Sequence, residues 1–205
     1  MRYILDSGNK MYKKESGNMD RKIVFGISLV YVLWMAVLCA MQYTAGASWK
    51  AAVAAGGVIS GAIPLILSWV PRLRFHLPLV ISYFLFLTGS QYFGSIRGWY
   101  GLGWWDTFLH FVSGLLLGFA AIALYERLVH RDAGKAISAW FVFLFVLGFA
   151  ALGGVMWEIY EFSGDQFFGT TLQGGGNKDT MTDLIADVLG GLVVATGSGI
   201  RTKRK

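Results

Sequence analysis

The chain alternates between long uncharged stretches and short segments that carry most of its charged residues. A transmembrane helix needs about 20 apolar residues to cross about 30 Å of hydrocarbon. Five stretches reach this length with no Asp, Glu, Lys or Arg: 23–44, 51–71, 76–96, 107–125 and 136–157. Each of them is predicted to be a membrane-spanning helix.

The last uncharged stretch, 188–200, is too short to cross a membrane alone. It becomes long enough when a helix begins near Thr180 and takes Asp183 and Asp187 into the membrane. Strands are excluded, because lipid-facing barrel strands alternate polar and apolar residues and these stretches do not. The pattern predicts an all-α, polytopic bundle of about six transmembrane helices with both termini on one side.

Composition agrees with this interpretation. The 205 residues are 55% hydrophobic and 15% charged, which is too little charge for a soluble domain of this size. We expect a cytoplasmic N-terminal tail over 1–21, one six-helix transmembrane domain over 22–200 and a basic cytoplasmic tail over 201–205. The first span lacks a small-residue cleavage site, so we expect an uncleaved anchor. The single cysteine, Cys39, excludes an intramolecular disulfide.

The basic residues predict the orientation. Fifteen of the 18 Lys and Arg lie in the two tails and in the second and fourth loops, whereas only Lys50, Arg97 and Lys178 lie on the other side. By the positive-inside rule we expect both termini to lie in the cytoplasm. We expect the protein to be located in the plasma membrane. The same distribution explains the net charge of +6 without nucleic acid as a partner. Membrane lipids are the expected partners, a lipid-linked or small polar compound is the candidate substrate, and the oligomeric state is left open.

Seven carboxylates and one histidine gather on the outer halves of the last three spans. Within each span they are three or four residues apart, so each set lies along one helix face. These residues are Asp106 and His110, then Glu158, Glu161 and Asp165, then Asp179, Asp183 and Asp187. The sequence therefore places an acidic cluster with one imidazole on the extracytoplasmic side.

Small residues continue the same faces toward the cytoplasmic side. They are Gly114 and Gly118, Gly154, Gly191 and Ala195. Small residues allow helix backbones to approach closely inside membranes. We therefore expect the three acidic faces to meet in the bundle interior, around one outward-opening cavity.

Helix capping is the simplest alternative for some of these acids. Asp106 and Asp179 suit the N-terminal caps of the fourth and sixth spans, and Thr180 with Asp183 matches a capping box. Capping does not explain Asp187, which lies about 12 Å of helix rise beyond Asp179. It does not explain Glu158 and Glu161 either, because they lie at a C-terminal helix end where the dipole disfavours carboxylates.

Several buried carboxylates need a compensating charge, and Arg97 and Lys178 are too few to supply it. A divalent cation (Mg, Mn, Ca or Zn) is one solution, and shared protons or water are the other. Glu158 and Asp187 are the candidate catalytic residues. The candidate metal ligands are Asp106, His110, Glu158, Glu161, Asp179, Asp183 and Asp187.

The second half of the chain resembles a known family over residues 104–191. The matching features are Trp105-Asp106 with His110 and Gly114, Trp157-Glu158 with Glu161, Gly169 to Gln173, and Asp179 to Asp187 followed by Gly190. They resemble the poorly characterised bacterial membrane family typified by YjdF and, more loosely, VanZ-like membrane proteins. The turn over 172–179 is longer than that family's compact one. The resemblance implies the fold, the membrane location and a shared polar set, without a reaction.

Three function classes fit these residues. The first is a membrane hydrolase acting on a lipid-linked or envelope substrate through a divalent cation. The second is a proton- or cation-coupled transporter, and the third is a non-catalytic envelope or resistance factor. The inner halves of the last three spans hold almost no charge, which favours a site open to one side.

Orientation is tested with C-terminal reporter fusions. Alkaline phosphatase fused after Lys205 is expected to be inactive, because the basic-residue distribution places that end in the cytoplasm. A fluorescent protein that matures only in the cytoplasm is expected to be bright at the same point. An active phosphatase with a dark fluorescent fusion would contradict the orientation.

Overall fold

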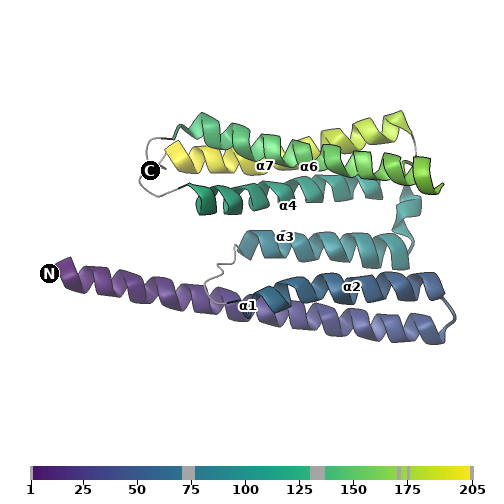
Figure 1. Ribbon diagram of the computed structural model, residues 1–205, viewed down its shortest axis with the longest axis horizontal. Helices are drawn as coiled ribbons and strands as arrows, with labels where there is room; N and C mark the ends of the chain where they lie inside the picture. The colour runs from purple at the N-terminus through teal and green to yellow at the C-terminus, as the bar shows by residue number, and fades with distance from the viewer. Residues whose placement is uncertain (1, 71–76, 130–136, 170–171, 175, 204–205) are drawn as a thin grey trace. The chain divides into compact units, whose positions relative to one another are not determined.

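The computed structural model of the chain describes residues 2–70, 77–129, 137–169, 172–174 and 176–203. Within these ranges the regular elements are helices, with no strand (Figure 1). Some residues of the predicted spans and basic segments lie outside the described ranges: Pro71, Arg72, Arg74, His76, Arg131, Lys135, Ala136, Arg204 and Lys205.

Six helices in the described residues are long and apolar enough to cross a membrane. They are Met19–Thr44, Ser48–Leu67, Leu77–Ile96, Trp105–Leu128, Ala139–Phe167 and Asn177–Ile200. The predicted all-α architecture with six spans is confirmed. The sixth helix does take Asp183 and Asp187 into its span, as its short uncharged stretch requires.

The chain divides into two compact units, Met1–Arg97 and Gly98–Lys205. Unit 1 contains three helical segments: α1 (Arg2–Thr44), α2 (Ser48–Leu67), and α3 (Leu77–Leu87) with its π-helical continuation η1 (Thr88–Ile96). Helix α1 therefore continues back through the polar N-terminal segment. Unit 2 contains the 3₁₀ turn η2 (Trp99–Leu102) and the helices α4 (Trp105–Leu128), α6 (Ala139–Phe168) and α7 (Asn177–Lys203).

Unit 1 is held together by an apolar core and one buried tyrosine contact. Gly57 and Gly61 of α2 lie against the side chains of Met35 and Tyr31 of α1, so a methyl group at either glycine would overlap them. The Tyr31 hydroxyl donates to Oε1 of Gln91 at 2.8 Å, which links α1 to η1. This contact satisfies a polar group that would otherwise be unpaired among apolar side chains.

Unit 2 depends on backbone contact between α4 and α7. A Cβ atom on Gly114 would overlap the carbonyl group of Asp187, and one on Gly190 would overlap the carbonyl oxygen of Phe111. On α6, a Cβ on Gly154 would meet the Asp187 side chain, with Oδ2 at 2.6 Å. The prediction that small residues bring these three acidic faces together is confirmed.

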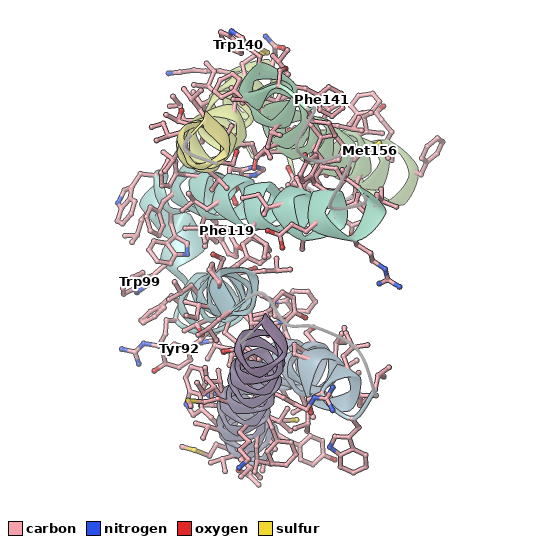
Figure 2. The ribbon with its side chains drawn as sticks, turned by 90° about the vertical axis from the view of Figure 1, so that its left-hand side faces the viewer. Tyr92, Trp99, Phe119, Trp140, Phe141 and Met156 are labelled. Carbon is pink, nitrogen blue, oxygen red and sulfur yellow. The ribbon has the colours of Figure 1, made fainter. Side chains whose placement is uncertain are left out.

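The two ends of unit 2 differ in character. The beginnings of α4 and α7 and the end of α6 lie at one end (Figure 1). The acidic residues predicted for the site lie on these helix segments. Toward the other end the interior is apolar, with a buried core of Ala121, Val142, Val146, Val194 and Ala195. Outward-pointing side chains of α6 such as Trp140, Phe141 and Met156 are exposed, as expected for a lipid-facing surface (Figure 2).

The close approach of α4 and α7 is tested by adding one methyl group. Gly114→Ala is expected to destabilise the protein by about 1–3 kcal/mol, because a backbone carbonyl has to move. The thermal unfolding temperature measured in detergent should fall by several degrees. Gly197→Ala in α7 is the matched control: nothing lies within 4 Å of its Cβ, so stability should be unchanged or higher. Equal effects of both substitutions would contradict this packing.

Candidate functional site

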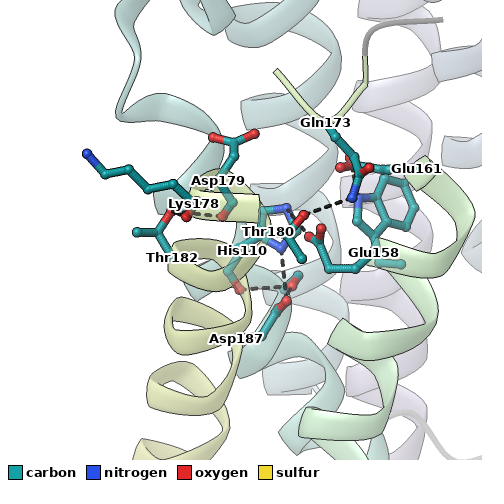
Figure 3. A network of polar contacts seen from close by, with 11 residues as sticks. His110, Glu158, Glu161, Gln173, Lys178, Asp179, Thr180, Thr182 and Asp187 are labelled. Atoms are coloured by element: carbon teal, nitrogen blue, oxygen red, sulfur yellow. Dashed lines mark hydrogen bonds and ion pairs between the residues drawn. The ribbon is translucent and has the colours of Figure 1, made fainter. Parts of the chain in front are cut away.

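The candidate site lies among the three helices at the acidic end of unit 2 (Figure 3). Asp106 is in the first turn of α4, and His110 follows one turn later. Asp183 and Asp187 lie one turn apart on α7, and Glu158 lies on the last turns of α6. Four-residue spacing puts each pair on α4 and α7 on one helix face, and the burial of His110, Asp183 and Asp187 shows that these faces point inward.

His110 is the centre of the polar contacts. Its Nδ1 lies 2.9 Å from Oδ2 of Asp187, and its Nε2 lies 3.8 Å from Oε1 of Glu158 (Figure 3). The exposed fractions of His110 and Asp187 are only 5% and 1%. An ionised carboxylate can only accept hydrogen bonds, so an ionised Asp187 places the ring proton on Nδ1 and leaves Nε2 free to act as a ligand or base.

Both oxygens of Asp187 are engaged. Oδ2 pairs with His110, and Oδ1 accepts a hydrogen bond from the hydroxyl of Ser113. Ser113 lies on the side of Asp187 rather than beside the free Nε2 of His110, so the three residues do not form a nucleophilic triad. Asp187 therefore holds the imidazole ring in place.

A second group of side chains has the spacing of metal ligands. Asp106, His110 and Asp183 each offer one ligand atom, and these atoms lie within 4.8 Å of one another. Asp183 is fully buried, His110 is buried and Asp106 is half-buried. In the described part of the chain no further set of three such residues comes this close.

The unusual feature of the site is its unpaired carboxylate oxygens. Both oxygens of Asp183 and both of Glu158 lack a hydrogen-bond partner among the described residues, at exposed fractions of 0% and 5%. Burying an unpaired carboxylate costs several kcal/mol. These oxygens need a positive or proton-donating partner. One Glu158 oxygen lies 3.8 Å from Nε2 of His110, and Asp183 offers an oxygen within 4.8 Å of a ring nitrogen of His110.

The other two predicted ligands lie at the edge of this group. Glu161 is buried and accepts a hydrogen bond from the indole Nε1 of Trp157 at 2.8 Å. Asp179 is half-buried in the first turn of α7, one turn before Asp183. Neither residue belongs to the set with metal-ligand spacing, and their role as ligands stays a prediction.

The capping alternative is wrong for Asp106 and Asp179. The N-cap of α4 is Trp104, without a side-chain cap, and Asp106 lies inside the first turn. Helix α7 begins at Asn177, so Asp179 also lies inside it. Both carboxylates still interact favourably with the helix dipole. A capping bond therefore accounts for neither residue.

Sequence reasoning missed the separate role of Asp165. Its carboxylate accepts two backbone hydrogen bonds from the loop after α6, from Leu172 N at 2.7 Å and Gln173 N at 3.0 Å. The helix ends at Gly169, whose φ of 63° favours glycine. No local pattern marks this contact, because the loop has to fold back before its amides reach Asp165. Ser113, by contrast, lies three residues after His110 and was recognisable on that face.

The fold and the site define a class: a polytopic helical membrane protein with a buried acid and histidine cluster. The family described as "Predicted membrane protein (DUF2238)" matches residues 25–204, and the chain belongs to this family. This confirms the resemblance to a poorly characterised polytopic membrane family, although the match does not carry the names YjdF or VanZ. No curated protein and no solved structure matches the chain.

The anchoring role of Asp165 is tested by hydrogen exchange. Asp165→Ala removes the acceptor of two amides, and hydrogen bonds to charged groups contribute about 1.5–3 kcal/mol each. Exchange of the Leu172 and Gln173 amides is therefore expected to accelerate by about tenfold or more. Ser163→Ala is the control, because that hydroxyl bonds within its own helix, to Ile159 O. Unchanged exchange in Asp165→Ala would contradict the contact.

Proposed function

We propose that unit 2 binds one divalent cation between Asp106, His110 and Asp183, with Glu158 beside it. The observation that carries this proposal is the set of four buried oxygens of Asp183 and Glu158 that lack hydrogen bonds to the described residues, beside His110. A cation with two positive charges compensates these carboxylates more fully than a single shared proton. The short separation of the three ligand atoms supports the same conclusion.

The donor set favours particular ions. Carboxylate oxygens suit Mg²⁺, Ca²⁺ and Mn²⁺, whereas an imidazole nitrogen suits Zn²⁺ and other transition metals. Mn²⁺ and Zn²⁺ accept both kinds of donor, so they are the preferred candidates. With three protein ligands, such an ion keeps a position for water or substrate.

The contacts divide the roles of the predicted catalytic residues. Asp187 holds Nδ1 of His110, which is the usual arrangement of a carboxylate that orients a metal-binding histidine. In this proposal Asp187 therefore orients the ligand His110 and does not bind the cation itself. Glu158 faces Nε2 from the opposite helix with its oxygens unpaired, so it is placed to take a proton from a water molecule.

We propose hydrolysis as the reaction class. A divalent cation supplies Lewis-acid activation of a water molecule or of a substrate oxygen, and Glu158 supplies the base. The substrate is a lipid-linked or envelope compound that enters from the outer side. The acidic end of unit 2 is opposite the C-terminal end of α7. The predicted cytoplasmic C-terminus therefore supports a site that is open to the extracytoplasmic side.

The apolar half of unit 2 favours this function over coupled transport. A transport pathway needs polar groups on both sides of the binding site. In the described part of unit 2, the side of the interior away from the acids is filled by the core around Val146 and Val194. A hydrolase needs access from one side only.

The cation site is tested by Mn²⁺ titration of the purified full chain in detergent, followed by electron paramagnetic resonance. We expect one bound ion in the wild type and none in Asp183→Asn. Asp187→Asn should weaken binding by about 10–100-fold, because it disturbs the orientation of His110. Glu126→Gln is the matched control, an exposed carboxylate at the other end of α4, and should bind like the wild type.

Thermal unfolding provides a second measurement. Chelation should lower the unfolding temperature of the wild type, and Mn²⁺ or Zn²⁺ should restore it, because a ligand at about 100 times its dissociation constant contributes about 2.7 kcal/mol. No response to Mn²⁺, Zn²⁺, Mg²⁺ or Ca²⁺ would overturn the proposal. The cluster would then be interpreted as a protonated network, either structural or part of a transporter.

A further inference from the structure

Thr180, in the first turn of α7, lies between the loop residue Gln173 and the carboxylate of Glu158 (Figure 3). The side-chain amide of Gln173 donates from Nε2 to Oγ1 of Thr180 at 2.8 Å. Because that nitrogen only donates, the Thr180 oxygen is the acceptor of this bond. The hydroxyl hydrogen of Thr180 therefore points away from Gln173 and is available to another acceptor.

Glu158 is the acceptor that faces this hydroxyl. The Thr180 side chain interacts with the Glu158 carboxylate across the boundary between α7 and α6, although neither carboxylate oxygen is within regular hydrogen-bond geometry. In the described part of the chain the Thr180 hydroxyl donates no hydrogen bond in such geometry, so its hydrogen is available to Glu158. A half-buried hydroxyl that faces a buried carboxylate without hydrogen bonds favours formation of that bond.

The hydroxyl groups of Thr180 and Thr182, both in the first turns of α7, form different hydrogen bonds. Threonine hydroxyls in helices often donate to a carbonyl of the preceding turn. The Thr182 hydroxyl lies 3.1 Å from Lys178 O and 2.8 Å from Asp179 O, as this habit predicts. The Thr180 hydroxyl instead accepts from the loop and faces the interior.

We propose that Thr180 is a positioning residue that donates its hydroxyl hydrogen to Glu158, and that Gln173 sets the direction of this donor. This inference rests on the proposed function in treating Glu158 as the base. The hydroxyl fixes which carboxylate oxygen is held and which one remains free to face Nε2 of His110.

The proposal extends the site to the loop. Asp165 holds the backbone of Gln173, Gln173 holds Thr180, and Thr180 holds Glu158. The Asp165 carboxylate only accepts, and the Gln173 side-chain nitrogen only donates. These two groups therefore set the donor-to-acceptor direction of each hydrogen bond in the series. The loop conformation is thereby coupled to the geometry of the base.

Infrared spectroscopy of the full chain in detergent tests the contact directly. Glu158 is identified as the band that Glu158→Gln removes, as a carbonyl stretch when protonated or as an antisymmetric carboxylate stretch when ionised. Loss of a donated hydrogen bond moves either band. We expect Thr180→Val to shift the Glu158 band, Thr180→Ser to leave it near the wild-type position, and Gln173→Leu to shift it in the same direction by less.

Thr182→Val is the matched control, because it removes a hydroxyl from the same helix without touching Glu158, so the Glu158 band should not move. If Thr180→Val does not fold, Gln173→Leu carries the test, since its side chain lies in the loop rather than in a helix. A Glu158 band unmoved by Thr180→Val or Gln173→Leu, or moved equally by Thr180→Ser and Thr180→Val, would overturn the proposal.

Mn²⁺ titration separates this inference from the proposed function. A wild type that binds no divalent ion, with a Glu158 band that still responds to Thr180→Val, would overturn the cation site and keep the contact. A wild type that binds Mn²⁺, with an unresponsive band, would keep the cation site and overturn the contact. When both hold, Thr180→Val should retain Mn²⁺ binding within about tenfold, because Thr180 is not a ligand.

Discussion

The constraint on which unit 2 depends is the burial of carboxylates among three helices in a membrane. A carboxylate in this environment is costly unless a donor or a positive charge faces it. Asp187 meets the requirement through hydrogen bonds with His110 and Ser113, whereas the oxygens of Asp183 and Glu158 form no hydrogen bond in regular geometry with the described residues. The same cost that makes these residues unfavourable for the fold makes them favourable for binding a cation or a proton.

The close helix contacts make this arrangement rigid. Gly114 and Gly190 allow the backbones of α4 and α7 to touch, and Gly154 lets α6 approach the Asp187 side chain. A larger residue at any of these positions would separate His110 from Asp187. Stability and site geometry are therefore set by the same contacts, and a substitution that loosens the packing also disturbs the imidazole.

The site also connects the tightly packed helices α4 and α7 to the loop that follows α6. His110 and Asp187 lie on the tightly packed pair α4 and α7, whereas Glu158 is on α6 and faces Thr180, whose hydroxyl contacts the loop through Gln173. In the hydrolase that we propose, Glu158 would be a base positioned by a loop beside a fixed histidine, an arrangement suited to a site that admits a substrate from one side. The apolar interior toward the other end completes this one-sided arrangement.

The sequence by itself determined the six spans and the helix faces that carry the acids. Charge-free length is a local property, and four-residue spacing places Asp183 and Asp187 on one helix face. The small residues that continue this face indicate that it points inward. Only the tertiary structure decided which oxygens are paired. The pairing of Asp187 with His110, the unpaired oxygens of Glu158 and the anchoring of the loop by Asp165 depend on the rotation and depth at which three helices meet. Distances of a few ångströms between helices distinguish a ligand from a residue that orients it, and no spacing within one helix contains that information.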